Sequence, residues 1–162
     1  MNNESKKESK LIIICICIIA VVLIALIGIA YLQRGNVTRT LKKQTTSDIK
    51  YDKEKLNIYF FWGDGCEHCE ALISFLNSLT EDYDKYFDLY TLEVWYNEDN
   101  NKLMTELTEE LGKEVKGIPC LIIGNQVFSG FSEDMKEDIK KAIKKEYKEN
   151  PQYDVYKEYK KN

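Results

Sequence analysis

Two cysteines separated by two residues form the most reactive pattern in the sequence. Residues 63–70 read GDGCEHCE, which places His68 between Cys66 and Cys69. A cysteine pair at this spacing can form a short disulfide, exchange that disulfide with another thiol, or contribute to a metal site. The elements around the pair must therefore decide between a structural disulfide, a redox centre and a metal clamp.

A strand and a helix are predicted on either side of the pair. Residues 56–62, LNIYFFW, are β-branched and aromatic, which is typical of a buried strand, and a Gly-Asp-Gly turn ends the run. After Cys66, apolar residues recur at helical spacing, so Cys66 is expected at or just before a helix N-terminus. The helix dipole and free N–H groups favour a thiolate there. We therefore expect Cys66 to attack, Cys69 to resolve, and a protonated His68 to stabilise the Cys66 thiolate.

The rest of the pattern predicts one α/β domain. Strands and helices alternate after the cysteine pair, and the last two strands are joined at Gly124-Asn125, which suits a hairpin turn. This order predicts a single mixed sheet, parallel across the helical crossovers and antiparallel in the final hairpin. The expected elements are strands at 87–95, 120–123 and 126–128, and helices at 100–112 and 132–148.

Two motifs in this order resemble the thioredoxin-like superfamily. They are FFWGDGCEHCE and, about fifty residues later, GIPCLIIG. The resemblance is to membrane-anchored bacterial thiol-disulfide oxidoreductases with a CxHC centre. It implies a thioredoxin-like fold, with one central mixed sheet flanked by helices, and a catalytic set of Cys66, Cys69 and His68. It also implies a cis Ile118-Pro119 bond in a loop that packs beside the cysteines and binds the substrate chain. No cofactor is expected, because electrons pass directly between sulfurs.

Three positions depart from the family pattern. Gly65 replaces a tryptophan that usually precedes the first cysteine of thioredoxins, and Phe60 stands where the family often has a buried acid. The CEHC centre is similar to the CxHC centres of protein disulfide isomerases and periplasmic thiol oxidases, which favours oxidation or isomerisation over reduction. Cys120 stands where threonine is common. It could approach Cys66 as a third thiol, but we favour inert packing.

An apolar run near the N-terminus predicts a membrane anchor. Residues 11–32 hold 22 uncharged residues, enough for a helix to cross a hydrocarbon layer of about 30 Å. A cleaved signal peptide is the alternative, because residues 28–30 have the small-x-small form of a cleavage site. The expected organisation is a tail at 1–10, a transmembrane anchor at 11–32, a flexible polar linker at 33–47, the thioredoxin-like domain at 48–150 and a frayed polar tail at 151–162.

The charge distribution bears on partners and location. Residues 1–45 carry seven basic and two acidic side chains, a net charge of +5, so the remainder carries −9 against −4 for the whole chain. An acidic domain gives no electrostatic reason to bind nucleic acid, and the basic residues flanking the span are read as contacts to anionic lipid headgroups. Positive charge is nearly equal on both sides of the span, so it does not orient the anchor. Stable disulfide exchange favours an extracytoplasmic domain.

The sequence thus predicts exchange with protein thiol or disulfide substrates and a membrane redox partner. Two alternatives stay open. One is an extracytoplasmic reductase, for example of the cytochrome maturation type, and the other is an accessory or metal-binding module. Cys66, His68, Cys69 and Cys120 are soft ligands suited to zinc or copper(I), although the position of His68 inside the CxxC loop is poor for joining both sulfurs on one ion. We therefore expect no metal.

Overall fold

The computed structural model describes residues 12–26, 39–114 and 116–161, in two compact units, 1–36 and 37–162. In the first unit, residues 12–26 form a helix with exposed apolar side chains. No helix among the described residues combines the length and apolarity needed to cross a membrane. The ends of the expected anchor, residue 11 and residues 27–32, lie outside the described residues, as do the tail at 1–10 and most of the linker. The anchor stays a prediction.

The second unit has a four-stranded mixed sheet of order β2-β1-β3-β4. The central strand β1 is parallel to β2 and antiparallel to β3, which continues antiparallel into β4. The turn at Gly124 has a φ of +57°, a left-handed conformation that favours glycine, so the predicted hairpin is confirmed. The strands are β1 (Leu56–Trp62), β2 (Phe87–Glu93), β3 (Cys120–Ile123) and β4 (Gln126–Ser129).

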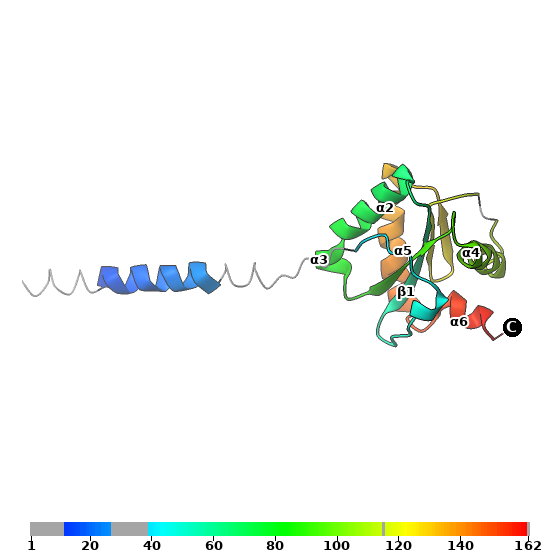
Figure 1. Cartoon of the computed structure of the whole chain (residues 1–162). Coiled ribbons are helices and arrows are strands. Elements are labelled where there is room, and N and C mark those ends of the chain that lie inside the picture. The colour runs from blue at the N-terminus through cyan, green and yellow to red at the C-terminus, as the bar shows by residue number, and fades with distance from the viewer. Residues whose placement is uncertain (1–11, 27–38, 115, 162) are drawn as a thin grey trace, which may run out of the picture. The chain divides into compact units, whose positions relative to one another are not determined.

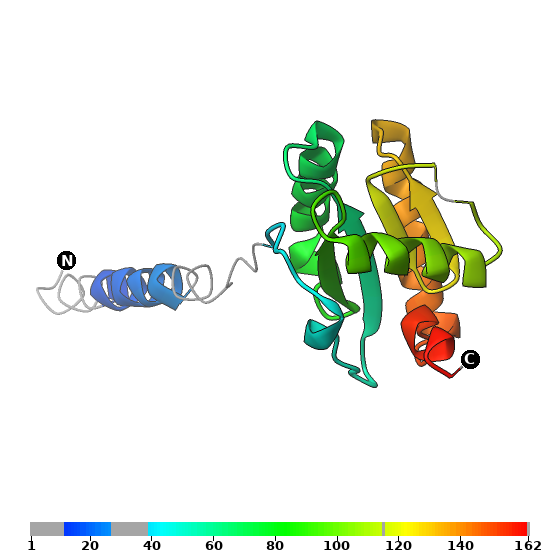
Figure 2. The ribbon, with the colours of Figure 1, turned by 45° about the vertical axis from the view of Figure 1, so that its right-hand side comes forward.

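Helices cover both faces of this sheet, which makes an α/β fold of three layers (Figures 1 and 2). Every residue of β1 is buried, and its side chains alternate between two hydrophobic cores, as the period of a strand requires. Phe60 and Trp62 face α2 and α5, whereas Tyr59 and Phe61 face α4 and α6. The architecture is compatible with the thioredoxin-like fold that the sequence predicts. The helices are α2 (Glu67–Ser78), α3 (Thr80–Tyr83), α4 (Glu98–Glu110), α5 (Lys136–Glu149) and α6 (Val155–Tyr159), with 3₁₀ helices η1 (Thr46–Asp48) and η2 (Glu133–Met135).

The helix starts differ slightly from the sequence prediction for local reasons. Asn97 caps α4 by accepting the N–H of Asn100 at 3.0 Å, so the helix begins two residues earlier than expected. Ser132 precedes η2 instead of α5, and its hydroxyl bonds the Asp134 carboxylate at 2.5 Å rather than a backbone N–H. α5 therefore starts at Lys136.

The linker is not flexible over its described part. Residues 39–49, which we call the strap, lie along the outer edge of β2. Arg39 exchanges two hydrogen bonds with the Asn77 side chain, pairs with Asp84 at 2.7 Å and lies over the Phe87 ring at 4.4 Å. The Thr91 hydroxyl in β2 bonds both backbone groups of Lys42, and the Thr91 N–H donates to the Gln44 side chain. The expectation of a loose tether is wrong here, because backbone groups of Lys42 and Gln44 and the Gln44 side chain bond Thr91 at the edge of the sheet.

The C-terminal tail is also ordered, so the expected fraying is wrong. Val155 and Tyr156 of α6 are buried in the core beneath α4. Asp154 caps α6 through the N–H of Lys157 at 2.9 Å, and its carboxylate accepts the hydroxyl of Tyr59 at 2.8 Å. The composition of this segment is polar, but one capped turn places its apolar residues in the second core.

Candidate active site

The cysteine pair lies at the connection from β1 to the first turn of α2. Gly65 has a φ of +87°, which turns the chain sharply, and the N–H of Cys66 bonds the carbonyl of Gly63 at 3.1 Å. Cys66 is the N-cap of α2, and its Sγ accepts the N–H of Cys69 at 3.2 Å. The predicted placement of Cys66 at a helix N-terminus is therefore confirmed.

The two sulfurs form a disulfide and differ in their exposure. Cys66 is half-buried, whereas Cys69 is fully buried in the core between the sheet and α2. An incoming sulfur therefore reaches Cys66 before it reaches Cys69. Trp62, the last residue of β1, belongs to the same core.

Charged side chains around the pair lie in solvent. His68, Glu67 and Glu70 occupy the first turn of α2 and are all exposed. Water screens charges in such positions strongly, so the backbone N–H groups act on the Cys66 sulfur from closer range than these side chains do. Asp64, in the turn before Cys66, pairs with Lys43 of the strap at 2.9 Å, and this hydrogen bond raises the pKa of Lys43.

The Ile118–Pro119 loop lies beside the cysteine turn. Its peptide bond is cis, as the resemblance implies. β3 begins at the next residue and pairs Cys120 with Phe61 near the end of β1, which carries the loop to the site. A Cβ added to Gly63 would collide with the Ile118 side chain, and Gly63 holds Cys66 through its carbonyl. The structure thus brings Ile118 and Pro119 together with the pair.

Cys120 lies on the other side of the sheet from Cys69. It is completely buried in the core under α4 and α6, and burial raises the pKa of its thiol to about 12. This placement favours inert packing over a third redox thiol. It also separates Cys120 from the other soft ligands considered for a metal, and within the described residues no group of three or more acidic, histidine or cysteine side chains is arranged to hold an ion.

A second group near the site was not found from the sequence. Trp95 was expected to end a strand, but β2 stops at Glu93 and the chain turns outward. The buried Glu93 carboxylate accepts the backbone N–H of Trp95 at 2.9 Å and of Tyr96 at 3.0 Å. The indole of Trp95 lies against Gly63, the residue bonded to Cys66. The available signal was the run EVWY at residues 93–96, an acid separated by one valine from two aromatic residues at a strand end.

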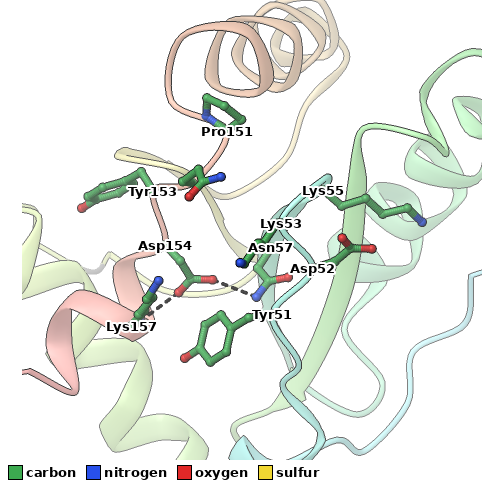
Figure 3. A pocket seen from close by; sticks show the side chains of 10 residues that line it. Tyr51, Asp52, Lys53, Lys55, Asn57, Pro151, Tyr153, Asp154 and Lys157 are labelled. Atoms are coloured by element: carbon green, nitrogen blue, oxygen red, sulfur yellow. Dashed lines mark hydrogen bonds between the residues drawn. The ribbon is translucent and has the colours of Figure 1, made fainter.

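A small pocket lies at the opposite end of β1 (Figure 3). Its volume is about 60 Å³, enough for a few water molecules. Asp154 lies at its centre, where it accepts a hydrogen bond from Asn57 at 2.8 Å and caps α6. Asn57 is at the start of β1, whereas Cys66 follows the end of this strand. The pocket therefore belongs to the polar contacts around Asp154 that attach the C-terminal segment, which we call the polar joint, and not to the cysteine site.

Comparison with known proteins gives little beyond this geometry. No protein-family model matches the chain, and no curated protein matches it. Among solved structures, it is similar to a chain in a crystal structure of a complex of ferredoxin:thioredoxin reductase and thioredoxin f2. The identity is 24%, the match covers 56% of this chain and 76% of that chain, and the TM-score is 0.36. So weak a likeness carries no argument about function.

Proposed function

We propose that residues 37–162 form a thioredoxin-like thiol-disulfide oxidoreductase that acts on protein substrates. The observation that carries the proposal is the Cys66–Cys69 disulfide at the N-terminus of α2, with its outer sulfur on Cys66 and the Ile118–Pro119 loop beside it. A disulfide that closes so short a loop stabilises a fold less than one that closes a long loop. Its half-exposed position at a helix N-terminus suits exchange better.

In the favoured direction, the disulfide oxidises a substrate. A substrate thiolate attacks Sγ of Cys66, the Cys66–Cys69 bond breaks, and Cys69 leaves as a thiolate that takes up a proton. A second substrate thiolate then attacks the substrate sulfur of this mixed disulfide and releases Cys66 as a thiolate. The substrate loses two electrons and gains a disulfide, while the enzyme gains both electrons as a dithiol. A partner disulfide must then reoxidise it.

The end of α2 favours this direction because it stabilises the reduced enzyme. The N–H of Cys69 donates to the Cys66 sulfur, and the N-terminus of α2 adds the positive end of the helix dipole. Negative charge on Cys66 is therefore stabilised, and a dithiol that is stabilised in this way makes its disulfide a stronger oxidant. We assign His68 a supporting role as an exposed charge beside the thiolate.

The substrate chain is proposed to lie along Ile118 and Pro119. Pro119 is buried and Ile118 is half-buried, and Ile118 also contacts the residue that hydrogen-bonds Cys66. A segment bound here would present its sulfur to the exposed side of the disulfide. This arrangement supplies orientation, and sulfur chemistry needs no cofactor.

We further propose that residues 11–32 anchor the protein in a membrane, with the redox domain on the extracytoplasmic side and a membrane redox partner. The support is the uncharged apolar run in the sequence and the compartment in which disulfides persist. Protease added to intact cells should degrade the domain and leave cytoplasmic proteins intact. A domain protected until the membrane is permeabilised would contradict this placement.

The reduction potential of the cysteine pair tests the proposed direction. It should be measured on residues 37–162 by equilibration with glutathione buffers, because both cores and the strap lie within that segment. A value between about −120 and −200 mV is expected for an oxidase or isomerase. A value below about −250 mV would favour the reductase alternative, and the absence of reversible exchange would favour an accessory or metal-binding module.

Two serine variants test the roles of the cysteines. Cys66→Ser should abolish turnover. Cys69→Ser should accumulate mixed disulfides formed when the Cys66 thiolate attacks a substrate disulfide, since the neighbouring thiol that resolves them in this reverse direction is gone. Cys120→Ser is the matched control and should keep the exchange, because Cys120 lies on the other face of the sheet. Full activity of Cys66→Ser would refute the mechanism.

A further inference from the structure

We infer that Trp95 and Tyr96 form a binding platform that selects substrates with an aromatic or large apolar side chain close to the reacting cysteine. This inference rests on the proposed function and names the class of polypeptide that it accepts. The large exposed hydrophobic residues of the described part of 37–162 are Tyr51, Trp95 and Tyr96, so two of the three are neighbours in one loop.

The platform lies in contact with the redox site. The Trp95 ring and the Ile118 side chain converge on Gly63, where even a methyl group would collide with both. The carbonyl of Gly63 accepts the N–H of Cys66. A substrate whose sulfur is bonded to Cys66 must therefore place its next few residues near Trp95, since an extended chain advances about 3.3 Å per residue.

The loop that carries the platform is held rigidly. Glu93 is only 2% exposed, and burial of a carboxylate is costly unless it is hydrogen-bonded. Both of its oxygens are used on the backbone N–H groups of Trp95 and Tyr96, and Asn100 bonds the Glu93 carbonyl at 3.0 Å. These bonds fix the backbone and leave much of both side chains in solvent, with Trp95 54% exposed and Tyr96 78% exposed.

The chemistry of the platform favours an apolar or aromatic partner. Trp and Tyr present large apolar area at low cost in conformational entropy, and aromatic pairs gain energy beyond the area that they bury. The nearby charges of Lys43 and Asp64 are paired with each other, and Lys43 lies 5.9 Å from the Tyr96 ring centroid. An unfolded segment whose core residues are still exposed supplies such side chains, so the expected occupant is a substrate that has not finished folding.

Peptide kinetics test this inference on the oxidised domain, residues 37–162. Two reduced peptides of equal length and charge are compared, one with Phe next to its single Cys and one with Gly there, and mixed-disulfide and product formation are followed by acid quench and mass spectrometry. We expect the Phe peptide to react about 3- to 10-fold faster with the wild type. Trp95→Ala should bring the ratio of the two rates close to 1, and Tyr96→Ala should lower it by a smaller factor.

The controls separate the possible failures. Tyr51→Ala removes an aromatic residue of similar exposure that lies beside the Asp154 pocket, and it should leave the ratio unchanged. Trp95→Phe should restore most of the ratio, because its ring keeps much of the apolar contact, and Trp95→Ala should keep the wild-type rate with the Gly peptide, which a misfolded variant would not. A wild-type ratio of 1, or a ratio kept by the Trp95→Ala/Tyr96→Ala double variant, would overturn the inference alone. A wild type that exchanges with neither peptide nor glutathione would overturn the proposed function and this inference with it.

Discussion

The buried thiol of Cys120 makes the stability of the domain depend on alkaline pH. Replacement by Ala removes the one free thiol of residues 37–162 when Cys66 and Cys69 are oxidised. The folded thiol has a pKa of about 12 because burial disfavours its anion, whereas an unfolded cysteine titrates near 8.5 to 9. The folded state therefore holds this proton more tightly than the unfolded state does.

The size of the effect follows from this difference. Because the folded pKa is raised, the contribution of Cys120 is fully present below about pH 8.5 and is lost as the pH rises toward 12. Between pH 7 and pH 10 the loss should be about 1.4 to 2 kcal/mol, from a slope of about 1.4 kcal/mol per pH unit above the unfolded pKa. Tyrosines also titrate in this range, so only the difference between wild type and Cys120→Ala isolates the thiol.

Urea unfolding at pH 7 and pH 10 measures this difference. The variant is expected to be less stable at pH 7, because it leaves a cavity, and to lose less free energy on the way to pH 10. The gap in stability should therefore narrow by about 1.4 to 2 kcal/mol, or roughly 1 M in the urea midpoint. An equal loss in both proteins would mean that the folded thiol ionises normally, and the inert-packing reading would have to be abandoned.

Two further predictions concern the segments that sequence reasoning misjudged. Asp154→Ala should destabilise the domain by about 3 kcal/mol in urea unfolding, since it leaves the buried Tyr59 hydroxyl without its acceptor and uncaps α6. The control Lys157→Ala, at an exposed neighbour, should cost well under 1 kcal/mol. Equal losses of stability in the two variants would contradict the role given to Asp154. A fragment that begins at residue 45 should be about 3 kcal/mol less stable than one that begins at residue 37, because it lacks the Arg39 contacts to Asn77, Asp84 and Phe87. Equal urea midpoints of the two fragments would show that these contacts do not stabilise the domain.

Much of the site could be predicted because its signals are local. A strand run, a glycine turn and helical spacing after Cys66 place the sulfur at a helix N-terminus, and hydrophobic periodicity gives the mixed sheet. The cis bond before Pro119 came from the family resemblance and not from the sequence itself, since an isolated X-Pro bond is mostly trans.

The remaining features depend on contacts between distant parts of the chain. Arg39 and Thr91 are polar residues whose partners are separated from them by about forty to fifty positions, so composition alone made the strap look like a linker. Asp154 finds Tyr59 across almost the whole domain, and this pairing turns a polar tail into a docked helix. Trp95 was assigned to a strand because propensity does not reveal that Glu93 bends the backbone outward.

The two ends of α2 make different contacts: one end binds the strap and the other carries the cysteine pair. Asn77, in the last turn, receives the strap at Arg39, while Cys66 caps the first turn. A helix of 12 residues is about 18 Å long, so α2 separates the strap contact at Asn77 from the Cys66 sulfur by about this length. The strap then runs from Arg39 to the other end of α2, where Lys43 pairs with Asp64 beside Cys66, so a substrate bound as proposed above would meet the strap as well as the disulfide.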